Sequence, residues 1–159
     1  MTSEGEPGAN GGPDRALLAA AAAFAAAAGL GSVVAIRDEL PGEPLGITVP
    51  LSVPAGLAVG WGAAVAAPWP MLAAALIAAA RCQRAAGGAA TGFVCAGIGL
   101  GCVAGTLVEP VTRRPGTWSP GTRLAITANL ASAAALVVAG WRHYRAAIPA
   151  AVPTSVPRT

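Results

Sequence analysis

Long runs of residues without a charged side chain constrain the fold of this 159-residue chain more than any other feature of its sequence. Four such runs cover residues 16–36, 55–80, 89–109 and 124–141, and the third ends at Glu109. A helix rises about 1.5 Å per residue, so the first run would be about 31 Å long, close to the thickness of the hydrocarbon core of a bilayer. The runs therefore predict an all-α integral membrane protein whose four transmembrane helices form one small bundle.

The composition excludes most soluble classes of protein. Charged residues make up 11% of the chain, whereas a soluble domain carries about 25%. So few charges cannot cover a globule with a solvated surface, and a net charge of +3 gives no footprint for nucleic acid. All ten basic residues are arginine and alanine is abundant, which is typical of GC-rich bacterial genes. We therefore expect a multi-pass protein of a bacterial cell membrane, with lipid as its first partner.

Both ends of the chain are expected to lie outside the helical bundle. Residues 1–15 are rich in glycine, glutamate and proline, and residues 146–159 hold three prolines and one charge. Segments of this kind bury too little apolar surface to offset the entropy of ordering. We predict disordered tails over these two ranges and a transmembrane domain over residues 16–145.

The second run needs a special explanation, because 26 helical residues would be about 39 Å long. Pro68-Trp69-Pro70 interrupts it. A proline inside a helix removes a hydrogen bond, and the residue before a proline avoids the α conformation. We expect a single helix kinked at Pro68 and Pro70. The alternative is an interfacial segment near residues 55–66, followed by a helix that starts near Pro70.

The arginines predict the orientation of the bundle. If the amino terminus is cytoplasmic, six arginines lie on the cytoplasmic side and four on the other side, because the loops alternate between the two sides. Positively charged residues are enriched in cytoplasmic loops. The chain is therefore expected to have both termini in the cytoplasm.

Three glycines in the third run recur at every fourth position. Gly97, Gly101 and Gly105 would share one helix face, where the missing side chains let another backbone approach closely. We expect this face to pack inside the bundle. Association with a second copy of the chain and a ligand groove are the alternatives.

Glu109 is the most unusual single residue, because it ends a helix at the border of the hydrocarbon region. A carboxylate at the carbonyl end of a helix is unfavourable and needs a partner. Arg113, Arg114 and Arg123 follow in the next loop. We expect a structural ion pair with one of these arginines. The alternatives are a gate or substrate-binding carboxylate at an outer mouth, and a solvated acid without a role.

The fourth run contains polar side chains that lipid cannot satisfy. Asn129 lies about a third of the way into the run, and Ser132 follows one turn later. A side-chain amide inside a membrane needs hydrogen-bond partners from protein. We therefore expect these two residues to join neighbouring helices.

The residues that could carry catalysis or bind a metal are few and far apart in the sequence. Cys95 and Cys102 would share a helix face about 10 Å apart, too far for a disulfide. There is no C-x-x-C motif, and the sole histidine, His143, has no second ligand three or four residues away. No phosphate-binding loop and no nucleophile with a nearby base is evident. We expect no enzyme activity, no cofactor and no metal.

Two functions remain from the sequence alone. The favoured one is a non-enzymatic bundle that associates with itself or with a larger membrane complex, because no ionisable residue lies in the middle of a run. The alternative is a small transporter or channel that uses Glu109 near its outer mouth.

Overall fold

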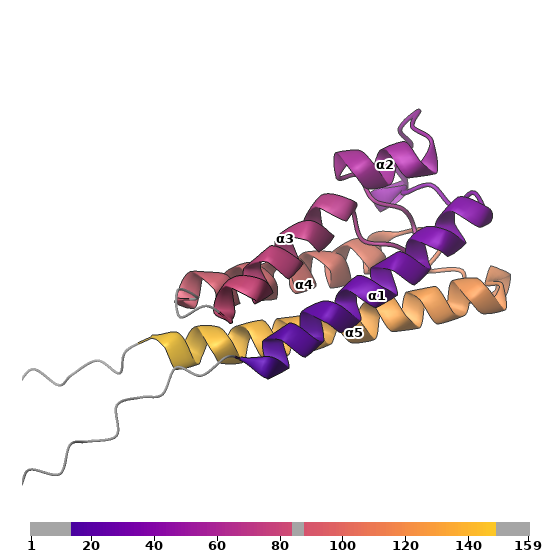
Figure 1. Cartoon of the computed structure of the whole chain (residues 1–159). Helices are drawn as coiled ribbons and strands as arrows, with labels where there is room; N and C mark the ends of the chain where they lie inside the picture. Colours follow the sequence, from indigo (N-terminus) through magenta and orange to yellow (C-terminus); the bar gives the residue numbers. More distant parts are fainter. Residues whose placement is uncertain (1–13, 84–87, 149–159) are drawn as a thin grey trace, which may run out of the picture.

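The computed structural model of the protein describes residues 14–83 and 88–148, and within these ranges it is all-helical (Figure 1). The predicted tails fall mostly outside the described residues, although both Arg15 and Ala147 are helical. The helices and the two short 3-10 turns are α1 (Arg15–Arg37), η1 (Pro44–Gly46), α2 (Val53–Val59), α3 (Trp69–Cys82), α4 (Ala89–Val108), η2 (Pro115–Thr117) and α5 (Pro120–Ala147).

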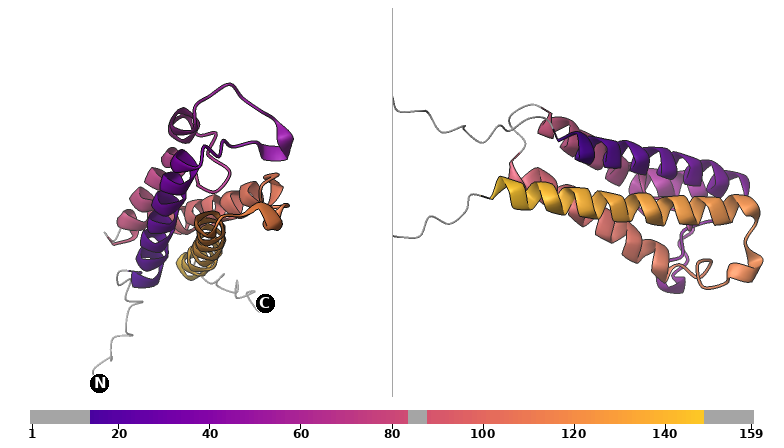
Figure 2. Two further views of the ribbon diagram at one scale, coloured as in Figure 1. Left: turned by 90° about the vertical axis from the view of Figure 1, so that its right-hand side faces the viewer. Right: turned by 90° about the horizontal axis from the view of Figure 1, so that it is seen from below.

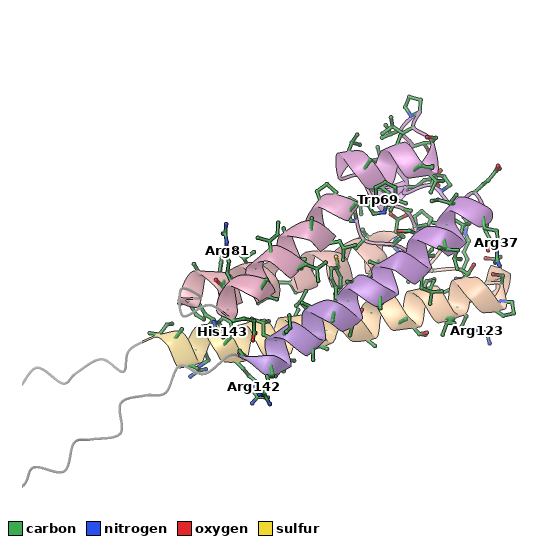
Figure 3. The ribbon with its side chains drawn as sticks, viewed as in Figure 1. Arg37, Trp69, Arg81, Arg123, Arg142 and His143 are labelled. Carbon is green, nitrogen blue, oxygen red and sulfur yellow. The ribbon has the colours of Figure 1, made fainter. Side chains whose placement is uncertain are left out.

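Three of these helices, α1, α4 and α5, are long and apolar enough to cross a membrane. Figure 3 shows Arg37 and Arg123 toward one end of the bundle, and Arg142 and His143 toward the other. Charged side chains at both ends of an apolar bundle are compatible with a membrane protein. α3 has 14 residues, or about 21 Å of helix, which is shorter than a hydrocarbon core. Four spanning helices are therefore not confirmed.

The second run does not form the single kinked helix that we expected. α2 ends at Gly60, whose φ of 96° places it in the left-handed region, and a non-helical segment over residues 60–68 follows. Pro68 and Pro70 stand at the start of α3, where a proline costs no hydrogen bond. They begin a helix rather than bend one. The alternative, a separate segment followed by a helix from near Pro70, is closer to the structure.

The segment 60–68 lies inside the protein. Its residues 63–66 are buried in a cluster with Ala35 of α1 and Ile126 of α5, and Ala67 belongs to the other core cluster. The backbone of Val65 passes so close to Gly31 in α1 that a β-carbon there would collide with the Val65 carbonyl oxygen. A glycine in α1 thus makes room for irregular backbone within the bundle.

The four longer helices form a closed ring. α5 packs against both α4 and α1, and α3 also packs against both of them (Figure 2). α3 runs from Trp69, whose indole N–H donates to Ser32 of α1, to Cys82, which contacts His143 of α5. We call the end that holds α2 the α2 end. The opposite end, where α1 begins and α5 finishes, is the His143 end.

The tightest helix contact joins α4 to α5 through Gly92, Gly99 and Gly140. A β-carbon added to Gly99 would lie 2.6 Å from the carbonyl oxygen of Ala133, and one added to Gly140 would lie 2.6 Å from the amide nitrogen of Ala96. Two backbones can approach this closely only where side chains are missing. The buried positions of α4 follow one another at steps of three and four residues: Gly92, Cys95, Gly99, Cys102 and Thr106.

Gly97, Gly101 and Gly105, which we call the glycine stripe, do not make this contact, although we expected them to pack inside the bundle. A β-carbon on Gly97 or Gly105 would meet nothing within 4 Å, and one on Gly101 would touch only the end of Met71. The expectation of close packing within the chain is therefore wrong for this face. The reason is geometric, because it is Gly92 and Gly99 that lie on the side of α4 that faces α5. Association between copies through the stripe stays a prediction.

Candidate functional site

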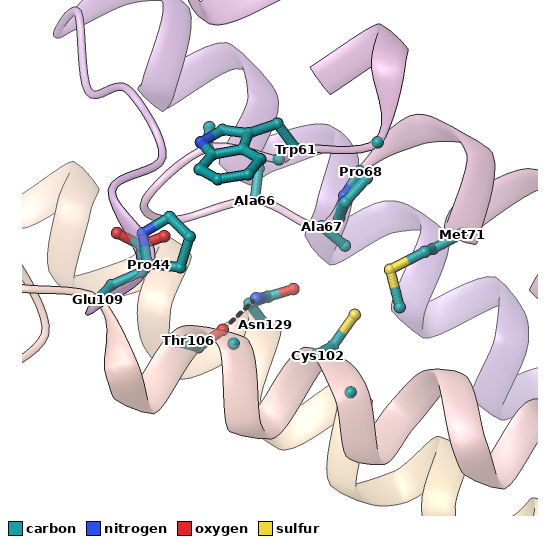
Figure 4. A pocket seen from close by; sticks show the side chains of 15 residues that line it. Pro44, Trp61, Ala66, Ala67, Pro68, Met71, Cys102, Thr106, Glu109 and Asn129 are labelled. Atoms are coloured by element: carbon teal, nitrogen blue, oxygen red, sulfur yellow. Dashed lines mark hydrogen bonds between the residues drawn. The ribbon is translucent and has the colours of Figure 1, made fainter. Parts of the chain in front are cut away.

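A cavity of about 200 Å³ at the α2 end brings together Glu109 and Asn129, two residues singled out from the sequence (Figure 4). Its walls come from the last turns of α4, from α5, from the start of α3 and from segment 60–68. Two glycines of the stripe, Gly101 and Gly105, also line it. Part of the stripe thus faces a cavity, which was the third of the three interpretations of that face.

Glu109 is buried, and no arginine of the described residues forms an ion pair with it. Its side chain is 6% exposed, and its Oε2 accepts a hydrogen bond of 2.9 Å from the backbone N–H of Glu43. Among the described residues no ion pair joins Glu109 to Arg113, Arg114 or Arg123, all three of which are exposed. The expected ion pair is therefore wrong.

The local backbone explains why the arginines point away. Glu109 precedes Pro110 and adopts an extended conformation (φ −66°, ψ 134°), as residues before proline prefer. A turn follows in which the N–H of Arg113 donates to the carbonyl of Pro110. Helix α4 thus ends with the carboxyl group directed into the bundle, whereas the loop carries its arginines to the surface, where water hydrates them.

Burial raises the pKa of Glu109 above its ordinary value, since the charged form loses hydration. The hydrogen bond from the Glu43 backbone lowers this pKa, and the negative charge of the Glu43 side chain raises it again. The net effect is an increase. A carboxyl group that is costly to ionise gains stability from a bound proton or cation.

Asn129 joins two helices, as the sequence predicted. Its side chain is 2% exposed, and its Nδ2 donates a hydrogen bond of 3.1 Å to the Oγ1 of Thr106 in α4. Ser132 does not cross between helices, because its hydroxyl donates to the carbonyl of Asn129 in its own helix. Thr106 was missed in the sequence, although it occupies the same three-and-four pattern as Cys95 and Cys102.

The oxygen of the Asn129 amide, unlike its nitrogen, has no hydrogen-bond partner among the described residues. Asn129 Oδ1 is buried and accepts no hydrogen bond from any residue that the structure describes. Buried polar atoms are nearly always paired, so an exception beside a cavity points to a missing donor. Figure 4 shows the amide in the wall of the cavity, with its nitrogen bonded to Thr106 and its oxygen turned away from that bond.

Trp61 and Met71 form the apolar part of the wall. The indole Nε1 of Trp61 donates a hydrogen bond of 2.8 Å to the carbonyl of Gly42, which fixes the position of the ring. The ring and the Met71 thioether lie across the cavity from Thr106 and Cys102 (Figure 4). Neither residue was found from the sequence, because both fell in the run interpreted as one helix.

A second polar cluster closes the His143 end. His143 Nδ1 lies 2.9 Å from Asp14 Oδ2, and its Nε2 lies 3.3 Å from Cys82 Sγ. Asp14 also caps α1 by accepting from the N–H of Leu17. The expectation that no nucleophile has a nearby base is therefore wrong, because a thiol and an imidazole are adjacent. Cys82 is 7% exposed, and the contacts tie the ends of α1, α3 and α5 together.

The cluster escaped sequence reasoning because its members are far apart along the chain. Asp14 and His143 are separated by 129 positions, and Cys82 and His143 by 61. No local spacing indicates such contacts. Within the residues described, no group of three or more histidine, cysteine, aspartate or glutamate side chains could hold a metal ion.

No family model, curated protein or solved structure matches this chain. The cavity and its side chains are therefore the basis for a functional proposal. Among the described residues, Asn129 Oδ1 in its wall is buried without a donor, Glu109 uses only Oε2 as an acceptor, and no basic side chain lines the cavity. Such a cavity is suited to a ligand that carries hydrogen-bond donors or a positive charge.

Proposed function

We propose that this chain is a small membrane transport protein that binds a positively charged solute in the cavity beside Glu109. The observation that supports it is the buried carboxyl group of Glu109, which faces the cavity without a basic partner. Ionisable groups buried in membrane proteins mark ion and substrate pathways. The sequence favoured a non-enzymatic associating bundle because no ionisable residue lies in the middle of a run. Glu109 stands at the end of α4, and its burial beside the cavity is what supports the transport alternative. The proposal assigns the chain binding and passage of a solute, without catalysis.

The segment over residues 60–68 supports the same proposal. Non-helical backbone is tolerated at membrane depth only where protein covers it or where it lines a cavity. This segment does both, since its alanines are buried and Trp61 contributes to the cavity wall. Broken helices of this kind form the substrate sites of many transporters.

The predicted orientation indicates the face of the membrane toward which the cavity lies. The His143 end holds the start of α1 and the end of α5, and the cavity lies toward the opposite end. With cytoplasmic termini, the cavity would face the exterior of the cell. A solute would then enter from outside, past the loop that carries Pro44.

Association of the chain is the second candidate, because α4 leaves much of its surface open. Gly97 is exposed, and Phe93 and Leu100 on the same helix are more than half exposed. A copy of the chain could pack on this surface through the glycines. The two candidates are compatible, since the cavity lies between α4 and α3 within one chain.

The experiment is charge movement measured on supported membranes that carry the purified protein. Concentration jumps of NaCl, KCl, NH₄Cl and butylammonium chloride would each be applied to the wild type, Glu109→Gln and Arg113→Gln. We expect at least one cation to produce a current in the wild type and in Arg113→Gln, and none in Glu109→Gln. Equal currents in Glu109→Gln, or no current from any cation in the wild type, would refute transport through this site.

A further inference from the structure

We infer that the solute is a small organic ammonium ion, a protonated amine with a short alkyl chain. This inference rests on the proposed cation site and goes beyond it by naming the class of ligand. Three features of the cavity support it: its size, its polar atoms and its apolar wall.

The size of the cavity argues against a bare metal ion or a proton. An engineered cavity of about 150 Å³ holds a benzene molecule, and this cavity measures about 200 Å³. It therefore has room for an organic molecule of about six heavy atoms. A divalent ion such as Ca²⁺ needs about six to eight oxygen ligands, whereas much of this wall is alanine, glycine and proline.

The polar atoms of the cavity require a ligand with N–H donors. Asn129 Oδ1 is buried without a donor, and Glu109 Oε1 accepts no hydrogen bond from the residues described. A primary ammonium group carries three donors and one positive charge, so it can pair with the carboxylate and still has N–H groups to donate to other oxygens of the wall. A single carboxylate in the wall balances one positive charge, which favours a monovalent ligand.

The apolar wall accounts for the rest of the ligand. The ring of Trp61 is held by its hydrogen bond to Gly42, and Met71 lies on the same side of the cavity (Figure 4). A cation over the face of a tryptophan ring is attracted to its π-electrons, and an alkyl chain packs well against a thioether. Sodium and potassium ions have no alkyl chain that could pack against Met71, so this apolar wall favours an organic cation over them.

Two glycines of α4 provide a matched test of the location. Gly105 lines the cavity, Gly97 does not, and a β-carbon at either position would meet no atom within 4 Å. The first carbon of a new side chain therefore has room at both positions. In Gly105→Leu the new side chain would occupy the cavity, whereas in Gly97→Leu it would lie on the outer surface of the same helix.

The experiment is titration calorimetry on the purified full-length protein in detergent, with n-butylammonium chloride as the probe. Sodium chloride, tetramethylammonium chloride and neutral n-butanol serve as comparisons. We expect butylammonium to bind most tightly, because tetramethylammonium has no N–H donor and butanol has no charge. Glu109→Gln should weaken butylammonium binding by about tenfold or more. Gly105→Leu should abolish the binding, and Gly97→Leu should leave it unchanged.

Each contrary result has a distinct meaning. Equal binding of butylammonium and sodium would overturn the ammonium inference and leave the proposed cation site standing. Equal binding of butanol and butylammonium would show an apolar pocket and overturn the inference as well. Undiminished cation binding in Glu109→Gln would overturn the cation site itself. If Gly105→Leu elutes as aggregate, the comparison of Glu109→Gln with wild type still tests whether the carboxylate binds the cation.

Discussion

Replacing Gly99 by alanine should push α4 away from α5, whereas the same change at Gly97 should not. The added β-carbon at Gly99 would lie 2.6 Å from the carbonyl oxygen of Ala133 and 3.0 Å from the amide nitrogen of Val137. Ordinary contacts of a β-carbon begin at 3.4 Å, so α5 would have to move by about 0.8 Å. The obstacle is backbone, which cannot rotate aside as a side chain can.

The magnitude follows from two opposing effects. Overpacking a close contact costs about 1–3 kcal/mol. Alanine also favours a helix over glycine by about 1 kcal/mol, which offsets part of that cost. We expect Gly99→Ala to lower the free energy of unfolding by up to about 2 kcal/mol. Gly97→Ala meets nothing within 4 Å, so it should raise the free energy of unfolding by up to about 1 kcal/mol.

The assay is titration of the purified protein with SDS in mixed micelles, followed by far-ultraviolet circular dichroism. The two variants carry the same chemical change in the same helix, two residues apart, so they control for each other. The reasoning about helix contacts would be refuted if both variants lost the same stability. It would also be refuted if Gly99→Ala were more stable than the wild type.

Three further predictions concern polar groups. Thr106→Val removes the acceptor of the Asn129 amide, so the same SDS titration should show a loss of about 0.6–2 kcal/mol; no loss would contradict an interhelical bond. Glu109→Gln should raise the melting temperature at neutral pH, because burial disfavours the charged carboxylate. The difference from wild type should shrink as the pH falls through the raised pKa of Glu109. A lower melting temperature in Glu109→Gln would instead support an ion pair of Glu109 with an arginine. Burial raises the pKa of Asp14, but hydrogen bonds from Leu17 and His143 lower it below 3.8 overall. The stability that Asp14 contributes is therefore present above pH 3.8 and lost in stronger acid, so Asp14→Asn should be less stable than wild type at pH 7 and similar to it at pH 2 in a thermal melt.

Two of the three long helices, α1 and α4, could be predicted closely because their signals are local. A charge-free run sets the length of a membrane helix, and the runs 16–36 and 89–109 differ from α1 and α4 by a residue at an end. The fourth run was predicted too short, since α5 continues through polar residues to Ala147. Hydropathy does not detect that extension, because helical hydrogen bonds form in water and in lipid alike.

The second run shows where local signals stop. The hydropathy of this run fits one kinked helix as well as it fits the observed arrangement, in which a short helix and a buried segment precede a second helix. The choice depends on whether another part of the chain leaves space for irregular backbone. Gly31 in α1 leaves that space for Val65, at a position 34 residues away in the sequence.

By itself the sequence determined the helical class, the ends of α1 and α4 and the unusual chemistry of Glu109 and Asn129. Those properties follow from charge-free runs and from single polar residues, because their stability depends on neighbours along the chain and on transfer into lipid. Only the tertiary structure decided the partners. It placed Glu109 beside a cavity and left the arginines exposed, because the turn after Pro110 separates them. It also selected Gly99 over Gly97 for the tight contact, since the face of α4 that meets α5 is set by packing of the whole bundle and by no repeat in the sequence.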